Sequence, residues 1–223
     1  MDKQGLPKEV QPSLERSELS TRVRTLFQES ISVKQQLIDS HVNTVVRIGE
    51  AIADSLQRGG KLMLCGNGGS AADAQHIATE LLVRLRPDFN RQGVPALSLA
   101  IDTSSLTACG NDYSFDYYYE RMVRTLGKPG DVLIGITTSG RSQNVIRALR
   151  TAREMNMIAV GLLGAGGGPA LAECDLALVV PSSITGRIQE SHITVGHALM
   201  ELVEDLLLES GYLTRMHRGG EGE

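Results

Sequence analysis

Two side chains able to do acid–base or metal chemistry lie four residues apart in a segment that should be helical. His76 and Glu80 belong to residues 71–85, which contain neither Gly nor Pro and are rich in Ala, Leu, Gln and Glu. Residues four apart share one face of a helix, so the imidazole and the carboxylate point the same way. Exposed helices often carry such a pair without any function, so its meaning depends on what surrounds it.

A second polar set opens the last predicted helix, which runs from about residue 187 to residue 209. It consists of Gln189, Glu190, His192 and His197. A histidine, a carboxylate and one or two more nitrogen or oxygen donors make a plausible site for a divalent metal ion. Gln189 and His197 are about 12 Å apart along a helix, so both could bind one ion only if the glutamine reaches forward and the histidine leans back. Spacing alone leaves open which donors take part.

A glycine-rich loop, Gly-Asn-Gly-Gly-Ser over residues 66–70, comes directly before the His76 helix. It follows the apolar run 61–65, which is typical of a buried parallel strand. A strand that enters a helix through such a loop offers backbone N–H groups and a positive dipole end to an anion. The candidate substrate-binding residues here are Asn67, Gly68, Gly69 and Ser70.

A second polar loop follows the apolar run 131–136 and carries four hydroxyls, those of Thr137, Thr138, Ser139 and Ser142. Hydroxyl donors at the start of a helix suit a phosphate monoester. An N-cap with spare hydroxyls is the alternative, because one capping serine would be enough for the helix. Neither loop has a Walker-type lysine or a Gly-x-Gly-x-x-Gly pattern, which disfavours nucleoside triphosphates and dinucleotides. The predicted ligand is a small phosphosugar.

Short apolar runs alternate with helical segments and predict an α/β fold with a doubly wound, five-stranded parallel sheet. The predicted strands are residues 61–65, 96–101, 131–136, 157–163 and 176–180. The predicted helices are residues 71–85, 116–126, 144–155 and 187–209, with one short helical turn at 104–109 and a turn signal at 110–112. Ligands of such folds bind outside the carboxyl ends of the strands, so both polar loops should line one crevice.

About forty residues of helical pattern precede the first strand. Apolar residues recur at three- and four-residue steps from Val23 to Leu56, and Gly59-Gly60 ends the pattern. An apolar stripe of this length exceeds what one sheet face can cover, which predicts an oligomer. The chain is expected to comprise a mobile arm (1–18), a single domain (19–210) and a polar tail (211–223).

Composition excludes several classes of function. The 223-residue chain has a formal charge of −4, so it lacks the basic surplus that binding to nucleic acid or to an anionic membrane requires. No apolar run approaches the roughly 18 residues that span a bilayer, and the N-terminus has no signal-peptide core. Three cysteines lack the spacing of a disulfide framework, and Cys65 is expected to be a buried strand residue. A soluble cytoplasmic protein is predicted.

Taken together, the motifs resemble the sugar isomerase (SIS) domain family. The resemblance covers about residues 20 to 210 and rests on motifs at 66–70, 76–80, 110–112, 138–145 and 187–197. It implies the branch of the family that converts sedoheptulose 7-phosphate to D-glycero-D-manno-heptose 7-phosphate through an enediol. That reaction is the first step of bacterial ADP/GDP-heptose biosynthesis, which supplies lipopolysaccharide. The resemblance also implies a homotetramer with active sites shared between subunits.

Site roles follow from the same resemblance. One Zn²⁺ per subunit would be held by His76, Glu80, Gln189 and His197, with Glu80 as the catalytic base and His197 as the acid. Phosphate contacts would come from Ser70, Thr137, Thr138, Ser139 and Ser142. Arg84 and Asp102 would be polar residues lining the site.

Other SIS proteins provide the alternatives. Some bind phosphosugars as regulators or associate with the bacterial replication initiator, and these tend to lose the carboxylate at position 80 and the histidine at position 197. This chain keeps both, which favours the isomerase over a non-catalytic role; the paired ligand helices also favour it over an etherase of amino-sugar phosphates. Arg141 and Gly186 depart from the residues usual in the family. These two departures leave the exact substrate preference open.

Overall fold

The computed structural model describes residues 15–215, so most of the predicted arm and tail (1–14 and 216–223) lie outside the described residues. Five parallel strands form one sheet in the order β2-β1-β3-β4-β5, which confirms the predicted doubly wound architecture. The strands are β1 (Leu62–Gly66), β2 (Ala96–Ser98), β3 (Val132–Thr137), β4 (Ile158–Leu163) and β5 (Leu176–Val179).

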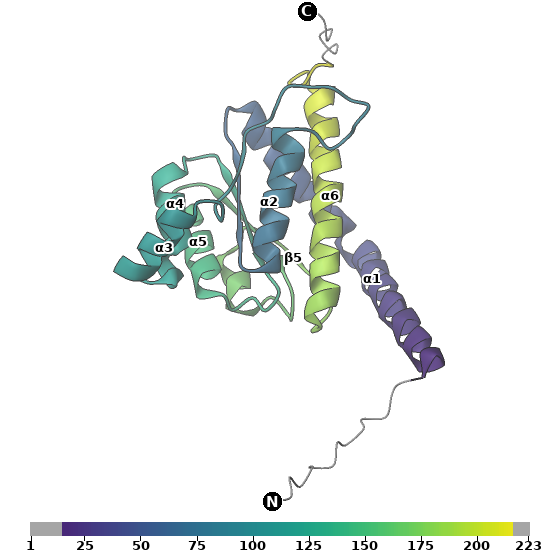
Figure 1. The fold of residues 1–223 in the computed structure, drawn as a ribbon. Helices are drawn as coiled ribbons and strands as arrows, with labels where there is room; N and C mark the ends of the chain where they lie inside the picture. Colours follow the sequence, from purple (N-terminus) through teal and green to yellow (C-terminus); the bar gives the residue numbers. More distant parts are fainter. Residues whose placement is uncertain (1–14, 216–223) are drawn as a thin grey trace, which may run out of the picture.

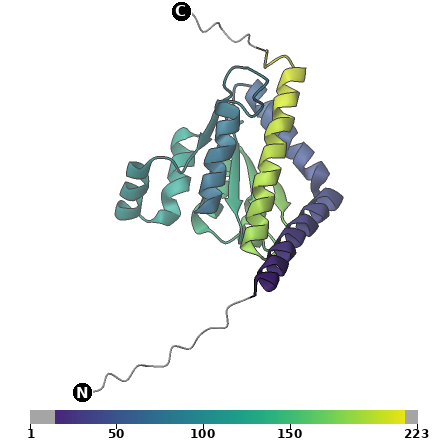
Figure 2. The ribbon, with the colours of Figure 1, turned by 45° about the vertical axis from the view of Figure 1, so that its right-hand side comes forward.

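Helices cover both faces of this sheet (Figure 1). One face is covered by α1 (Arg16–Gln57), α2 (Gly69–Leu82) and α6 (Thr185–Glu209). The other is covered by α3 (Thr103–Asp112), η1 (Phe115–Tyr117), α4 (Tyr118–Leu126), α5 (Gln143–Glu154) and η2 (Gly168–Glu173). Figures 1 and 2 both show α2 and α6 side by side across the front of the sheet.

Alternation along the buried strands divides the core into two layers. Leu62 and Leu64 of β1 pack under α1, α2 and α6, whereas Met63 and Cys65 face α4 and α5. This is the two-residue period of a strand, in which successive side chains leave opposite faces. Cys65 is fully buried as expected, and burial raises the pKa of its thiol to about 12. It is therefore a core residue and not a reactive one.

The long N-terminal segment is one helix. α1 has 42 residues, ends at Gln57 before the predicted Gly59-Gly60 stop, and begins at Arg16, slightly earlier than predicted. Its buried residues begin only at Val33, and in Figure 1 its N-terminal part projects away from the rest of the domain. Among the described helices, none is long and apolar enough to cross a membrane.

Several predicted boundaries are wrong; the helix predicted at 71–85, for example, runs from Gly69 to Leu82. β2 ends at Ser98, because it is an edge strand and Asp102 soon caps α3 by accepting hydrogen bonds from the amides of Ser104 and Ser105 at 2.9 and 3.3 Å. The residues predicted as a turn, 110–112, are the last turn of α3, which is a ten-residue helix. The 3-10 helix η2 begins at Gly168, directly after the N-capping residue Gly167.

Candidate functional site

The two polar loops meet where the winding of the sheet reverses. From β1 the chain moves to β2 on one side, whereas β3 to β5 lie on the other side, so β1 and β3 are neighbours. Ligands of doubly wound sheets bind at this position, at the carboxyl ends of the strands. Asn67 and Asn144 join the two loops through a reciprocal pair of amide hydrogen bonds, each 2.9 Å long. The two loops therefore lie side by side, as predicted.

The first loop has a shape that requires glycine. Gly68 adopts a φ of +57° as the residue that caps α2. A Cβ at Gly66 would lie 2.7 Å from the carbonyl oxygen of Ser70, so the chain can turn this tightly only without a side chain there. The hydroxyl of Tyr119 donates to the carbonyl of Gly66 from the opposite face of the sheet. Ser70 is thereby buried in the first turn of α2, next to the helix N-terminus.

Hydroxyls of the second loop contact each other and the loop backbone. Thr137 Oγ1 lies 3.1 Å from Ser142 Oγ, and Ser139 Oγ accepts a hydrogen bond from the amide of Arg141 at 3.2 Å. Gly140 has a φ of +63° and lies against Gly167, where a Cβ would be 2.0 Å from the carbonyl oxygen. This contact fixes the loop against the glycines that follow β4 and holds the hydroxyls at the start of α5.

The candidate metal and acid–base residues converge between α2 and α6. His76 Nε2 lies 2.8 Å from His197 Nε2 and 3.2 Å from Glu80 Oε1. One ligand atom from each of the three residues lies within 4.8 Å of the others. His197 thus faces the pair on α2, and it is the member of the second polar set that reaches them. Glu80 is almost buried, whereas His76 is half exposed.

The geometry of these three residues fits a zinc ion. Two nitrogen ligands at about 2.1 Å from one tetrahedral zinc ion are roughly 3.4 Å apart, so the two facing nitrogens, now 2.8 Å apart, would have to separate by about 0.6 Å to hold the ion. Two neutral imidazoles and a carboxylate are also a donor set that zinc accepts. Between neutral rings one Nε2 donates and the other accepts, so both nitrogens can bind a cation only after the donating ring has moved its proton to Nδ1.

Gln189 lies at the other end of α2. A Cβ at Gly69 would be 2.6 Å from Gln189 Nε2, so the amide packs on the backbone of the glycine loop. Gly69 is seven residues before His76, about 10 Å along the helix. The structure therefore brings Gln189 to the predicted phosphate loop, and its membership of the metal cluster remains a prediction.

Arg84 and Asp102 lie apart from both groups within one chain. Arg84 is exposed just beyond the end of α2, roughly 20 Å along the helix axis from Ser70. Asp102 is exposed at the carboxyl end of the edge strand β2, where its carboxylate caps α3. Neither has a contact with the loops or the histidines among the interactions of the described residues.

Two further polar groups lie near the site, one of which, Asp73, was not singled out for a role by the sequence. Asp73, one turn before His76, has a buried oxygen without a hydrogen-bond partner, and burial raises the pKa of this carboxyl against the lowering influence of His76. His192, which the sequence grouped with the metal donors, is fully buried and its Nε2 lies 3.1 Å from the carbonyl oxygen of Leu163. It anchors α6 to β4 and does not face the cluster at His76.

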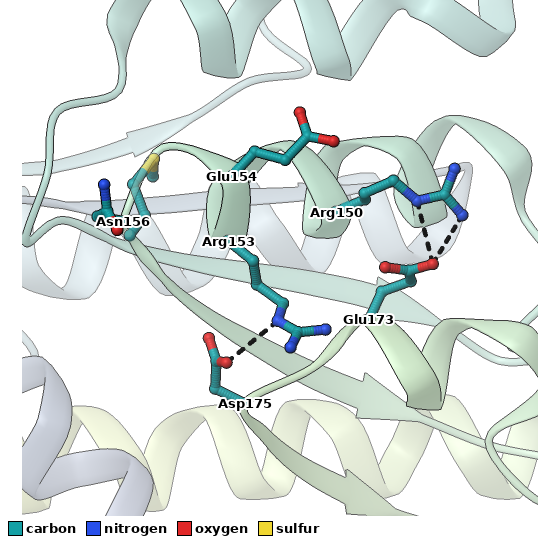
Figure 3. Close-up of a pocket in the computed structure, with 7 residues that line it drawn as sticks. Arg150, Arg153, Glu154, Asn156, Glu173 and Asp175 are labelled. Carbon is teal, nitrogen blue, oxygen red and sulfur yellow. Dashed lines mark hydrogen bonds and ion pairs between the residues drawn. The ribbon is translucent and has the colours of Figure 1, made fainter.

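A hollow of about 550 Å³ lies at the opposite end of the sheet, near the start of β4 and β5. Figure 3 shows its charged side chains paired with each other, with Arg150 bound to Glu173 at 2.6 Å and Arg153 to Asp175 at 3.2 Å. Mutual pairing leaves little charge for a ligand, and the amino ends of parallel strands are not where such folds bind substrates. This hollow is therefore a solvated surface and not the active site.

Comparison with known proteins agrees with the geometry. Residues 26–164 match the family model described as "SIS domain". A phosphoheptose isomerase from Roseiflexus sp. is 51% identical over 183 residues, which cover 82% of this chain and 92% of the relative. One from Paramagnetospirillum magneticum is 53% identical over 158 residues, 71% of this chain and 81% of the relative. The solved phosphoheptose isomerase GmhA from Neisseria gonorrhoeae has a TM-score of 0.78 and 43% identity, covering 84% of this chain and 99% of that one.

Proposed function

The chain belongs to the phosphoheptose isomerases of the SIS domain family, and we propose from this that it converts sedoheptulose 7-phosphate to D-glycero-D-manno-heptose 7-phosphate. The observation that carries the proposal is the placement of a glycine loop at the start of α2 and of a His–Glu–His cluster farther along the same helix, with the hydroxyl loop at the start of α5 joined to the glycine loop. One group suits a phosphate, and the other suits proton transfer at a carbonyl.

The spacing of the two groups matches the length of a heptose phosphate. Ser70 is six residues before His76 and ten before Glu80, which correspond to about 9 and 15 Å along α2. A chain of seven carbons with bonds of about 1.5 Å extends roughly 8 Å, and the phosphate adds a few ångströms. A phosphate held by Ser70, Thr137, Thr138, Ser139 and Ser142 would therefore present C1 and C2 near the histidines.

Glu80 and His197 would transfer the protons. The Glu80 carboxylate would take a proton from C1 of the ketose while His197 donates one to the oxygen on C2, which gives an enediol. Return of the carbon-bound proton to C2 and loss of the proton on the C1 oxygen would give the aldose. The two sugars are isomers, so the steps balance without an oxidant or reductant.

We assign zinc as the resident metal, with His76, Glu80 and His197 as ligands and Gln189 as the predicted fourth. When bound, the ion would polarise the substrate oxygens and stabilise negative charge that develops on them. A histidine ligand retains its second ring nitrogen for hydrogen bonding, which would fix the orientation of each ring.

The proposal extends to a cytoplasmic homotetramer with shared sites. Arg84 and Asp102 lie away from the crevice of their own chain, and residues in such positions would act on the site of a neighbouring subunit. Unpaired cysteines at positions 65, 109 and 174 suit a reducing compartment.

The test is incubation of the purified protein with a panel of ketose phosphates, including sedoheptulose 7-phosphate, with NMR detection of the aldose product. Turnover of the heptose and not of shorter ketose phosphates is the expected result. Binding of the phosphosugars without any product would instead favour a regulatory SIS protein.

A further inference from the structure

A buried arginine, Arg91, is not part of the proposed catalytic set. It joins α2 and α6, the two helices that carry that set. The side chain of Arg91, in the connection between α2 and β2, has no solvent exposure, and its Nε donates to Glu204 Oε1 on α6 at 2.5 Å. From the same guanidinium, Nη2 donates to the backbone carbonyl of Glu80 at 2.7 Å and Nη1 to that of Leu81 at 2.9 Å. One side chain thus holds the end of α2 against α6.

These contacts supply hydrogen-bond donors to carbonyls at the C-terminal end of α2. The last four carbonyls of a helix lack intrahelical partners and carry the negative end of the dipole, so a cation that donates to them is stabilising. The amide of Val94 supplements Arg91 by donating to the Leu81 carbonyl at 2.9 Å. The residue whose backbone Arg91 holds, Glu80, is also the residue whose carboxylate faces His76.

On α6 the contact lies on the face that carries His197. Glu204 follows His197 by seven residues, which is close to two helical turns and returns to the same side. The helices approach closely beside His197 as well, because a Cβ at Gly196 would lie 2.6 Å from Ile77 Cδ1. The distance and relative rotation of α2 and α6 are therefore fixed at two positions along the helices, one beside the histidines and one at Arg91.

Glu204 has a second arginine neighbour, Arg86, whose side chain contacts residues of α6 only. Arg86 Nε lies 3.3 Å from Glu204 Oε2, an ion-pair distance without hydrogen-bond geometry. The other contacts of Arg86 are to Asp205 at 2.7 Å and to the carbonyl of Glu201 at 3.3 Å, both on α6. Arg86 thus offers a matched comparison, an arginine on the same carboxylate that does not hold α2.

We propose that Arg91 is a positioning residue of the isomerase site, which acts through the Glu80 backbone and Glu204 to align α2 with α6. It fixes where the His76 and Glu80 side chains stand relative to His197. The inference rests on the proposed function of that cluster. Arg91 itself touches neither substrate nor metal.

The principal test is Arg91→Lys. Lysine keeps a positive charge beside Glu204, but its compact ammonium cannot reproduce a planar fork that spans a carboxylate and two carbonyls. We expect the zinc dissociation constant, measured by chelator competition, to rise about 10- to 100-fold, the usual effect of losing an outer-shell partner. The kcat for sedoheptulose 7-phosphate should fall at least about tenfold, while KM stays within about threefold because the phosphate loops lie at the far end of α2.

Two further variants separate positioning from folding. Arg86→Met should leave the zinc dissociation constant and kcat within about threefold of the parent, because it does not release α2. The double variant Arg91→Leu with Glu204→Leu removes both buried charges, so it should fold, yet it should bind zinc as weakly as Arg91→Lys.

The outcomes distinguish this inference from the proposed function. A parent protein that binds zinc and turns over substrate, with Arg91→Lys unchanged in both, overturns the role of Arg91 alone. Equal losses in Arg86→Met and Arg91→Lys also overturn it, because they would reflect general loosening around Glu204. A parent that binds no zinc contradicts the proposed metal site, and the kcat of Arg91→Lys then decides the inference. A parent without turnover contradicts the proposed function.

Discussion

Among single residues, Glu80 combines a nearly buried carboxylate with a backbone carbonyl that is hydrogen-bonded to a buried arginine. Its Oε1 lies 3.2 Å from His76 Nε2, and its carbonyl accepts from Arg91. A carboxylate with few water contacts and a fixed direction is suited to take a proton from carbon, because little reorganisation precedes the transfer.

Glu80→Gln should therefore abolish most turnover. The amide is the same size but cannot accept the proton, so we expect kcat to fall at least about a hundredfold, the lower end for loss of a general base. The comparison is Glu201→Gln, which changes an exposed glutamate of α6 and should retain full kcat. Turnover of Glu80→Gln within tenfold of the parent, measured by NMR, would contradict the role of the carboxylate.

His76→Ala tests the metal. The parent should contain about one zinc ion per chain by elemental analysis, and the variant should lose most of it, because one of two facing imidazoles is gone. His41→Ala, on α1, should keep its zinc. The metal-free parent should retain its circular dichroism spectrum, since the domain has a core of its own and does not need the ion to fold. Undiminished zinc in His76→Ala would reject the cluster.

His192 should make the stability of the domain depend on pH. Burial lowers the pKa of this imidazole to about 4 in the folded chain, from its ordinary value of 6.5. The unfolded chain therefore binds the proton first as pH falls, so folding loses free energy between about pH 6.5 and pH 4. From pH 7 to pH 5 this residue should cost on the order of 2 kcal/mol.

The matched variant for this titration is His192→Asn, which keeps a side-chain donor for the Leu163 carbonyl but does not titrate. Urea unfolding at pH 7 and pH 5 should show a smaller loss in His192→Asn than in the parent. The same loss in both proteins would mean that His192 is not responsible.

At the scale of elements, helix periodicity predicts α2 and α6 well, because their signals lie within one segment. The i, i+4 spacing correctly places His76 and Glu80 on one face. Which residue of α6 meets them depends on the parallel alignment of α2 and α6 across the sheet, and that is a long-range property. The spacing therefore left open which donors of α6 take part, and the structure brings His197 to the cluster.

Arg91 shows why loop residues are harder to assign. Its sequence neighbours, Asn90 and Gln92, predict only a loop, and nothing local indicates burial. The available signal lies 113 residues away, where Glu204 interrupts the apolar face formed by Leu199, Val203 and Leu207. A carboxylate on a buried face requires a partner, but the sequence does not say which one.

Contact between the two glycine-containing loops can be tested by a pair of alanines. Gly140 and Gly130 both have a positive φ, +63° and +87°, but only Gly140 has a backbone neighbour within reach of a Cβ. Gly130→Ala should cost about 1 kcal/mol of unfolding free energy from backbone strain alone. Gly140→Ala should cost roughly 3 kcal/mol or more, because the clash with Gly167 adds to the strain.

The two alanine variants should also differ in function. Displacement of the Thr137–Ser142 hydroxyls in Gly140→Ala should raise the KM for the phosphosugar, whereas Gly130→Ala lies at the other end of β3 and should not change it. Equal stability and equal KM in the two variants would show that the loop contact is not important.

For the whole molecule, α1 exposes more apolar surface than a monomer normally leaves in water. Its side chains exposed by more than a third are Leu19, Val23, Phe27, Ile31, Ile38, Val42 and Val46. At the start of α6, Arg187 donates to the carbonyl of Leu26 at 2.5 Å, so this stripe borders the helix that carries Gln189. A second copy docked on the stripe would therefore lie near the active site.

The whole-molecule prediction is a homotetramer of four 24.0 kDa chains whose activity depends on assembly. Phe27 and Ile31 are 68% and 66% exposed on the projecting part of α1, and a charge there would have to be desolvated in an interface. Phe27→Glu combined with Ile31→Glu should lower the mass found by light scattering and reduce kcat together. Gln28→Glu, which adds a charge beside the stripe, should leave both unchanged. A fully active 24.0 kDa monomer of the parent would overturn both the assembly and the shared site.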